Sequence, residues 1–154
     1  MEPRNLDALD LSEGREELHS RTGLYATRNQ FPLIARIFLS VLFIWTGVGK
    51  ILNPVETQEY MAAHGLPLTG FFLVMTIAVE LLGGISLLLG VQARWGAAAL
   101  ALFLIPATLI FHTDFSDPTQ PTQFLKNLAI IGGLLMVIQH GAGAIALRFG
   151  RRVK

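Results

Sequence analysis

Residues 68–91 read LTGFFLVMTIAVELLGGISLLLGV, an apolar stretch in which Glu80 is the one charged side chain. A helix needs about 20 mostly apolar residues to cross the hydrocarbon core of a bilayer. The stretch therefore predicts a transmembrane helix with a carboxylate near its middle. An ionised carboxylate at that depth is costly unless it faces other helices and finds a partner, so the surroundings of Glu80 bear directly on function.

Three further runs have the same character, at 32–52, 95–112 and 124–147. Over the whole chain 52% of the residues are hydrophobic and only 15% are charged, whereas a soluble domain usually carries about a quarter charged residues. A soluble bundle would also need a charged outer face on each helix, which these runs lack. The sequence therefore predicts an all-α fold, an integral membrane four-helix bundle.

The distribution of charge predicts how the spans are oriented. Lys and Arg occur in the N-terminal tail, in the turn at 92–94 and in the C-terminal tail. The loops at 53–67 and 113–123 carry only acidic charges. Because basic segments stay on the cytoplasmic side, we expect both termini in the cytoplasm of a cell with a bacterial-type cytoplasmic (inner) membrane. The formal net charge of +1 offers no basic face for nucleic acid.

The chain divides into three segments of different composition. The first tail is rich in charge and contains Gly14 among its few leucines, which leaves two interpretations open, a disordered tail or a docking segment for a partner. The predicted segments are a cytoplasmic N-terminal tail at 1–31, a four-transmembrane-helix domain at 32–147 and a basic cytoplasmic C-terminal tail at 148–154.

The first outer loop predicts a short helix of its own. Pro54 follows Asn53, and proline is well tolerated in the first turn of a helix. Gly65 supplies a stop signal after the intervening residues. We therefore expect a short helix at 54–63, lying at the outer surface of the membrane.

Glu80 cannot reach water from the middle of its span, so we expect it to pair with a base inside the bundle. By depth the best partner is Arg36, one turn inside the first span, and Lys50, near the outer end of that span, is the alternative. Lys50 could instead extend its amine to the lipid headgroups. We expect His140, on the inner half of the fourth span, to lie near Glu80. The predicted intramembrane polar cluster, a candidate ligand or proton site, comprises Glu80, Arg36, Lys50, His112, Asn127 and His140.

Two interpretations of this cluster remain open, a polar clasp that fixes helix packing and a proton-accessible or headgroup-binding pocket. The chain has no cysteine, which excludes disulfides and thiolate metal sites. His112 and His140 are expected near opposite membrane faces, which argues against a haem held by two histidines. No metal-binding or nucleophile motif occurs. We therefore predict no metal, no cofactor of its own and no catalytic activity on its own.

Several short motifs follow one another along the four predicted spans. They are RIFLSVLFIWTGVGKILNP at 36–54, GLP at 65–67, VELLGGISLLLGV at 79–91, FH at 111–112 and FLKNLAIIGGLL at 124–135, with Arg94 between the second and third spans. In this order they resemble the DoxX family of small four-span membrane proteins, over residues 32–147. Recurrent positions of that family would correspond to Arg36, Gly47, Lys50, Glu80, Gly84, His112, Asn127, Gly132 and Gly133.

The resemblance implies a four-span fold, and the family name refers to a small subunit associated with quinone-linked oxidation of sulfur compounds or with terminal oxidase activity. The function that we favour from the sequence is a non-catalytic subunit of a larger membrane assembly, of this quinone-linked redox kind. The alternative is a binding protein or enzyme component with an intramembrane pocket around Glu80 for a quinone, lipid or small solute. Expected partners are membrane lipids and other membrane subunits or a second copy of the chain.

Overall fold

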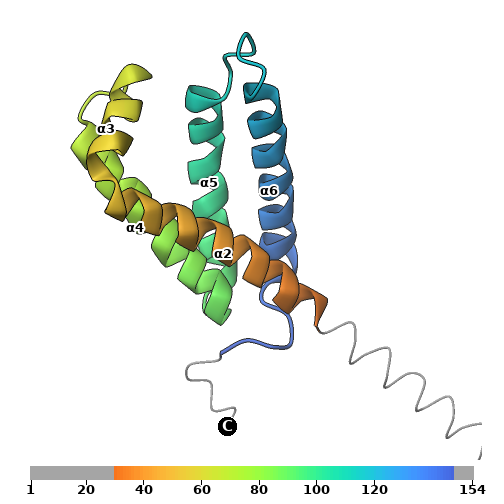
Figure 1. Ribbon diagram of the computed structural model, residues 1–154. Helices are drawn as coiled ribbons and strands as arrows, with labels where there is room; N and C mark the ends of the chain where they lie inside the picture. Colours follow the sequence, from red (N-terminus) through yellow and green to blue (C-terminus); the bar gives the residue numbers. More distant parts are fainter. Residues whose placement is uncertain (1–29, 148–154) are drawn as a thin grey trace, which may run out of the picture.

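The computed structural model describes residues 30–147 of the chain, which form five α-helices and no strand (Figure 1). Four of the helices are long and apolar enough to cross a membrane, and these are the four that the sequence predicts. The predictions for the two tails concern residues that lie almost entirely outside the described part. The helices are α2 (Phe31–Leu52), α3 (Pro54–Ala63), α4 (Thr69–Leu89), α5 (Ala93–Phe111) and α6 (Gln120–His140).

The fourth span differs most from its predicted bounds of 124–147. α6 begins at Gln120, because Pro121 fits the first turn of a helix. It ends at His140, because Gly141 adopts a φ of 74°, a conformation that glycine adopts without steric cost. The chain then turns back beneath the bundle, where the N–H of Leu147 donates to the carbonyl of Leu89 at 3.0 Å. The predicted last turns of this span are therefore a non-helical closing segment.

α4 lies between α2 and α5, and α6 packs on α5. Small residues allow the close approach, as is common between helices in membranes. A methyl group at Gly83 would come within 2.6 Å of Leu100 on α5, and one at Gly84 within 2.9 Å of Ile44 on α2. Gly132 of α6 is different, because no other part of the described chain comes within 4 Å of a methyl group placed there.

The two ends of the bundle carry opposite charge. We call the end that holds α3 and the loop after α5 the acidic end, since Glu56, Glu59, Asp114 and Asp117 lie there. The other end, with the α4–α5 turn and residues 141–147, is called the basic end.

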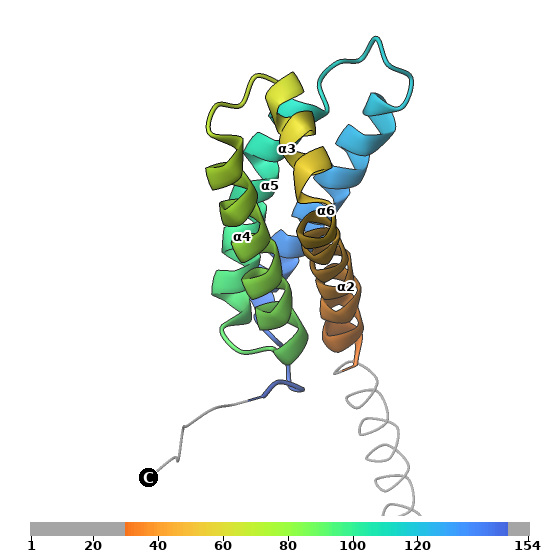
Figure 2. The same cartoon turned by 60° about the vertical axis from the view of Figure 1, so that its left-hand side comes forward.

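α3 has the predicted bounds of 54–63 and begins directly after α2 has ended at Asn53. Figure 2 shows that α3 follows the end of α2 and lies beside α4. Its Met61 is buried, and its backbone packs against α4 and α2. α3 therefore extends one side of the bundle at the acidic end, and its depth in the membrane stays a prediction.

Candidate functional site

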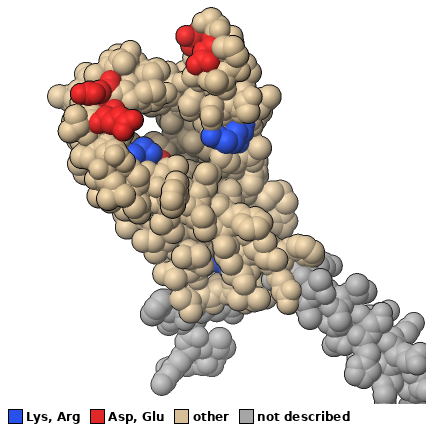
Figure 3. Space-filling view, in the orientation of Figure 1, with Lys and Arg blue, Asp and Glu red and all other residues tan. Residues whose placement is uncertain are grey.

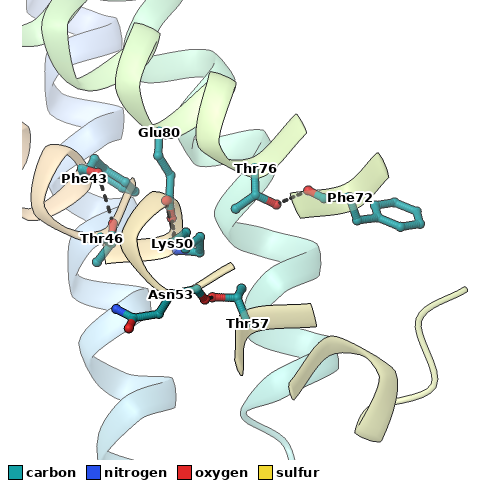
Figure 4. A network of polar contacts seen from close by, with 8 residues as sticks. All are labelled: Phe43, Thr46, Lys50, Asn53, Thr57, Phe72, Thr76 and Glu80. Carbon is teal, nitrogen blue, oxygen red and sulfur yellow. Dashed lines mark hydrogen bonds and ion pairs between the residues drawn. The ribbon is translucent and has the colours of Figure 1, made fainter. Parts of the chain in front are cut away.

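Glu80 of α4 is buried and paired with Lys50 of α2 (Figure 4). The Lys50 amine donates to both carboxylate oxygens at 2.9 Å. The Glu80 side chain is 5% exposed, and that of Lys50 is 23% exposed. Lys50 therefore turns inward to the carboxylate, which makes the preferred pairing of Glu80 with Arg36 wrong and the alternative right.

The packing of α2 on α4 explains why Lys50 is the partner. A methyl group at Gly47 would lie 3.4 Å from the Cβ of Glu80, so these two positions are level with each other. Lys50 is then one turn away, about 4.5 Å along the axis, whereas Arg36 is about 16 Å away in the other direction. Counting from the predicted span ends misses this register, because α2 stops short of the acidic end and α3 continues from it.

Arg36 has a different position and different partners. It is 1% exposed, and its guanidinium donates to the carbonyl of Leu87 at 3.0 Å and to that of Ile145. Leu87 lies in the last turn of α4, where carbonyls attract positive charge, and its carbonyl also accepts from the N–H of Gly90 at 3.2 Å. Arg36 thus fastens the end of α4 to the segment that follows α6, at the basic end.

A cavity of about 260 Å³ opens beside the Lys50–Glu80 pair. All five described helices contribute to its wall, which combines apolar side chains such as Phe43, Leu104 and Ile130 with a few polar ones. Figure 3 shows a hollow on the face that carries α3 on one side and α6 on the other. The polar lining consists of Thr46, Lys50, Thr57, Tyr60, Thr76, Glu80, His112, Lys126 and Asn127.

His112 and Asn127 occupy the α5–α6 side of the cavity, as expected of cluster members. The Nδ1 atom of His112 lies 2.9 Å from the Oε1 atom of Gln120. The amide nitrogen of Gln120 faces Asp117 at 3.4 Å, so Oε1 is the acceptor and His112 carries its proton on Nδ1. Asn127 donates to the hydroxyl of Thr108 at 3.1 Å. Lys50, Glu80, His112 and Asn127 are therefore brought to one cavity.

These helices carry a recognisable family sequence. The DoxX family profile matches residues 31–113, from the start of α2 to just past the end of α5, which is more than half of the chain. The chain belongs to the DoxX family. Its DoxX match includes both halves of the Lys50–Glu80 pair and His112, whereas Asn127 lies beyond the matched range.

Curated relatives of this DoxX protein agree with its four spans. It is 39% identical to inner membrane protein YqjF of Escherichia coli (strain K12) over 115 residues, which are 75% of this chain and 87% of YqjF. It is 30% identical to inner membrane protein YphA of the same organism over 127 residues, 79% of this chain and 91% of YphA. No solved structure matches the chain. With its four apolar helices, the chain is a multi-pass protein of the cytoplasmic (inner) membrane.

Two members of the predicted cluster lie elsewhere in this DoxX protein. Arg36 is at the basic end, as described above. His140 is the last residue of α6, exposed at that same end, with its Nδ1 atom 3.1 Å from the carbonyl of Met136. The expectation that His140 lies near Glu80 is therefore wrong, because α6 begins and ends earlier than the sequence predicts.

Five polar residues that line the DoxX cavity lie outside the predicted cluster: Thr46, Thr57, Tyr60, Thr76 and Lys126. Thr76 precedes Glu80 by four residues, so the shared helix face was a usable signal. Its hydroxyl donates to the Phe72 carbonyl at 2.7 Å, which leaves its oxygen lone pairs as acceptors (Figure 4). Nothing in the sequence indicates that Tyr60 and Thr57 turn inward from α3, since this depends on how α3 docks.

The arrangement presents both hydrogen-bond donors and acceptors to a small apolar space. Lys50 and Lys126 supply N–H donors, and Glu80 and Thr76 supply acceptors. No group of three or more His, Asp or Glu side chains among the described residues is arranged to hold a metal ion. The cavity is therefore suited to bind the polar head of an amphiphilic molecule.

Proposed function

We propose that this DoxX protein binds a small amphiphilic molecule, of the quinone, lipid or small-solute class, in the cavity beside Glu80. The observation that carries the proposal is that the buried Lys50–Glu80 pair forms part of the cavity wall. Ligand sites are typically concave and mostly apolar, with a few convergent polar groups. This cavity has the same character.

The exposure of Lys50 favours binding over a purely structural pair. A structural ion pair inside a bundle is most stable when side chains enclose both partners and complete their hydrogen bonds. Glu80 meets this condition, but the Lys50 side chain is 23% exposed and lines the cavity. A ligand with a hydrogen-bond acceptor would complete the hydrogen bonds of that amine.

Filling the cavity tests this function. Ala107 lines the cavity, whereas Ala129 is exposed on the outer face of α6. We expect Ala107→Phe to abolish the co-purification of small molecules after gentle detergent extraction, and Ala129→Phe to leave it unchanged. Native mass spectrometry and lipid extraction of both variants measure this. If Ala107→Phe retains the same bound molecules as the unaltered protein, the cavity is not their site and the proposal is wrong.

A second candidate is the subunit role in a larger membrane assembly that the sequence favours. Trp45 supports it, because its side chain is 78% exposed on α2, about 10 Å inside the end of that helix. Tryptophan in membrane proteins prefers the lipid–water interface, so a neighbouring subunit would be a suitable cover for this one. Native mass spectrometry of the extracted protein distinguishes the candidates: stable partner chains support the subunit role, and a lone chain with a bound small molecule supports the first.

We also propose that the acidic end faces outward and that both termini are cytoplasmic. The proposal is supported by the charge of the loops. The chain has no native cysteine, so single cysteines report cleanly. We expect Ser116→Cys to react with an impermeant thiol reagent on intact spheroplasts, and Ala144→Cys to react only after the membrane is opened. The reverse pattern would overturn the orientation.

A further inference from the structure

The cavity opens sideways, between α3 and α6. α3 packs against α4 and α2, and within the described residues its backbone does not approach that of α6. The hollow in Figure 3 lies on this face, and residues of both helices line it. Because α6 is long and apolar enough to span the membrane, we expect an opening beside it to face lipid. A molecule dissolved in the bilayer can therefore enter without passing through water.

The route along the bundle axis is narrowed by aromatic rings. Tyr60 of α3 stacks on Phe111, the last residue of α5, with 5.3 Å between ring centroids. His64 packs against both rings, at 4.4 and 5.1 Å. This stack joins α3 to α5 across the acidic end of the cavity. We expect this stack to restrict access from water at that end.

The charges of the cavity select a negative headgroup. Lys50 is neutralised by Glu80, but Lys126 contacts only the side-chain oxygen of Gln123, and among the described residues no carboxylate pairs with it. Lys126 lies about 9 Å inside α6 from Gln120, at the side opening. The Lys126 side chain is exposed, so it places an uncompensated positive charge at the mouth of a mostly apolar cavity, where it can attract an anion.

Soluble anions meet negative charge at the acidic end. Glu56 and Glu59 lie on one side of it, and Asp114 and Asp117 lie on the other. Hydrogen bonds from the backbone N–H and the hydroxyl of Thr119 lower the pKa of Asp117, which keeps this carboxyl ionised. An anion approaching from water is repelled there, whereas the head of a membrane-dissolved amphiphile reaches Lys126 from the side.

We infer that the cavity binds the acidic headgroup of a membrane amphiphile, which enters between α3 and α6 and is held by Lys126 while its chain remains in the bilayer. This inference rests on the proposed binding function and names the class of ligand. The volume of the cavity is consistent with a site that takes only the headgroup. It is about 260 Å³, below the roughly 300–1,000 Å³ of pockets that enclose a whole drug-sized ligand. A carboxylate and a phosphate monoester share this chemistry, and the experiment below distinguishes them.

The test uses the full chain in nanodiscs of zwitterionic lipid, with a photoreactive palmitate analogue as the probe at mildly alkaline pH. Palmitate, hexadecyl phosphate and hexadecanol compete for the site, and inorganic phosphate reports on soluble anions. We expect cross-links on α3 and α6 peptides and competition by either or both of the acidic amphiphiles, which identifies the headgroup. Hexadecanol and inorganic phosphate should compete at least about tenfold more weakly.

The decisive variant is Lys126→Gln, and its matched control is Arg94→Gln, since Arg94 is exposed at the basic end and away from the cavity. Lys126→Gln should weaken competition by the acidic amphiphiles about tenfold, because one charge-assisted hydrogen bond is lost. Arg94→Gln should leave it unchanged. Equal competition by palmitate and hexadecanol, or unchanged competition in Lys126→Gln, overturns the inference. The proposed function survives that result if Ala107→Phe still abolishes cross-linking, and fails with it if cross-linking persists in Ala107→Phe.

Discussion

Each half of the bundle holds an inward-facing cation from α2, but the two cations have different partners. At the basic end the guanidinium of Arg36 is 1% exposed and donates to backbone carbonyls of α4 and of the closing segment. Toward the acidic end the amine of Lys50 pairs with a carboxylate and remains partly open to a cavity. The first arrangement uses a charge to complete helix ends, and the second leaves a charge where a ligand can reach it.

The comparison shows that burial of a charge in a span does not by itself indicate function. Intramembrane ionisable residues are functional candidates by default, yet Arg36 donates to backbone carbonyls and links the end of α4 to the segment that follows α6. A methyl group at Gly90 would collide with the Arg36 guanidinium, so this site has no room for a ligand. Function is better indicated by a charged group that borders a cavity, as Lys50 does.

The largest expected effect is the loss of the basic-end cation. Arg36→Gln should lower the free energy of unfolding by about 3–6 kcal/mol, because hydrogen bonds to charged groups contribute about 1.5–3 kcal/mol each and two are lost. The measurement is reversible unfolding in mixed micelles with a denaturing detergent. Arg94→Gln is the control, since Arg94 is exposed, and should cost less than about 0.5 kcal/mol. Equal losses of unfolding free energy in Arg36→Gln and Arg94→Gln would mean that the hydrogen bonds of Arg36 do not stabilise the fold.

Toward the acidic end, Glu80→Gln should lower the free energy of unfolding by about 2–3 kcal/mol in the same experiment. This lies below the roughly 3–5 kcal/mol typical of breaking a buried pair, because the Lys50 amine can turn toward the cavity and regain hydration. Glu59→Gln on α3 is the matched control, because Glu59 is exposed. A loss as small as that of the control would show that the pair contributes little to stability.

A double-mutant cycle sharpens the assignment of the partner. Glu80→Gln combined with Lys50→Gln should show a coupling of about 1–2 kcal/mol, since the two side chains are in contact. Combined with Arg36→Gln, the losses should add to within about 0.5 kcal/mol. Additive losses with Lys50, or a strong coupling with Arg36, would contradict the observed pairing.

The smallest effect concerns the glycines. Gly90→Ala should cost about 1–2 kcal/mol, because Gly90 has a φ of 74° and its missing Cβ leaves room for Arg36. Gly132→Ala should be neutral or stabilise by up to about 1 kcal/mol, because nothing lies within 4 Å of that position in α6. Melting temperatures of the detergent-solubilised variants compare the two. A larger loss for Gly132 would reveal a contact outside the described residues, such as a neighbouring subunit.

Much of the candidate site could be predicted from single positions. Glu80, Lys50, His112 and Asn127 are polar residues within or at the end of apolar runs, and all four line the cavity. Arg36 and His140 met the same criterion and lie elsewhere. The two groups differ because of the relative register of the helices. Counting residues along one helix gives the depth of a residue in that helix, but it does not show which residue of a neighbouring helix lies at the same level.

The sequence alone determined the four apolar helices, the short helix at 54–63 and the need of Glu80 for a base, because hydropathy, proline and an isolated charge act locally. Only the tertiary structure decided that the base is Lys50, since that follows from Gly47 packing level with Glu80. It also decided that α6 ends at His140, away from Glu80, and that α3 docks on α4 and not on α6, which leaves a cavity open between α3 and α6. Such contacts join residues far apart in the chain, and close packing between helices selects one register among several that hydropathy permits equally.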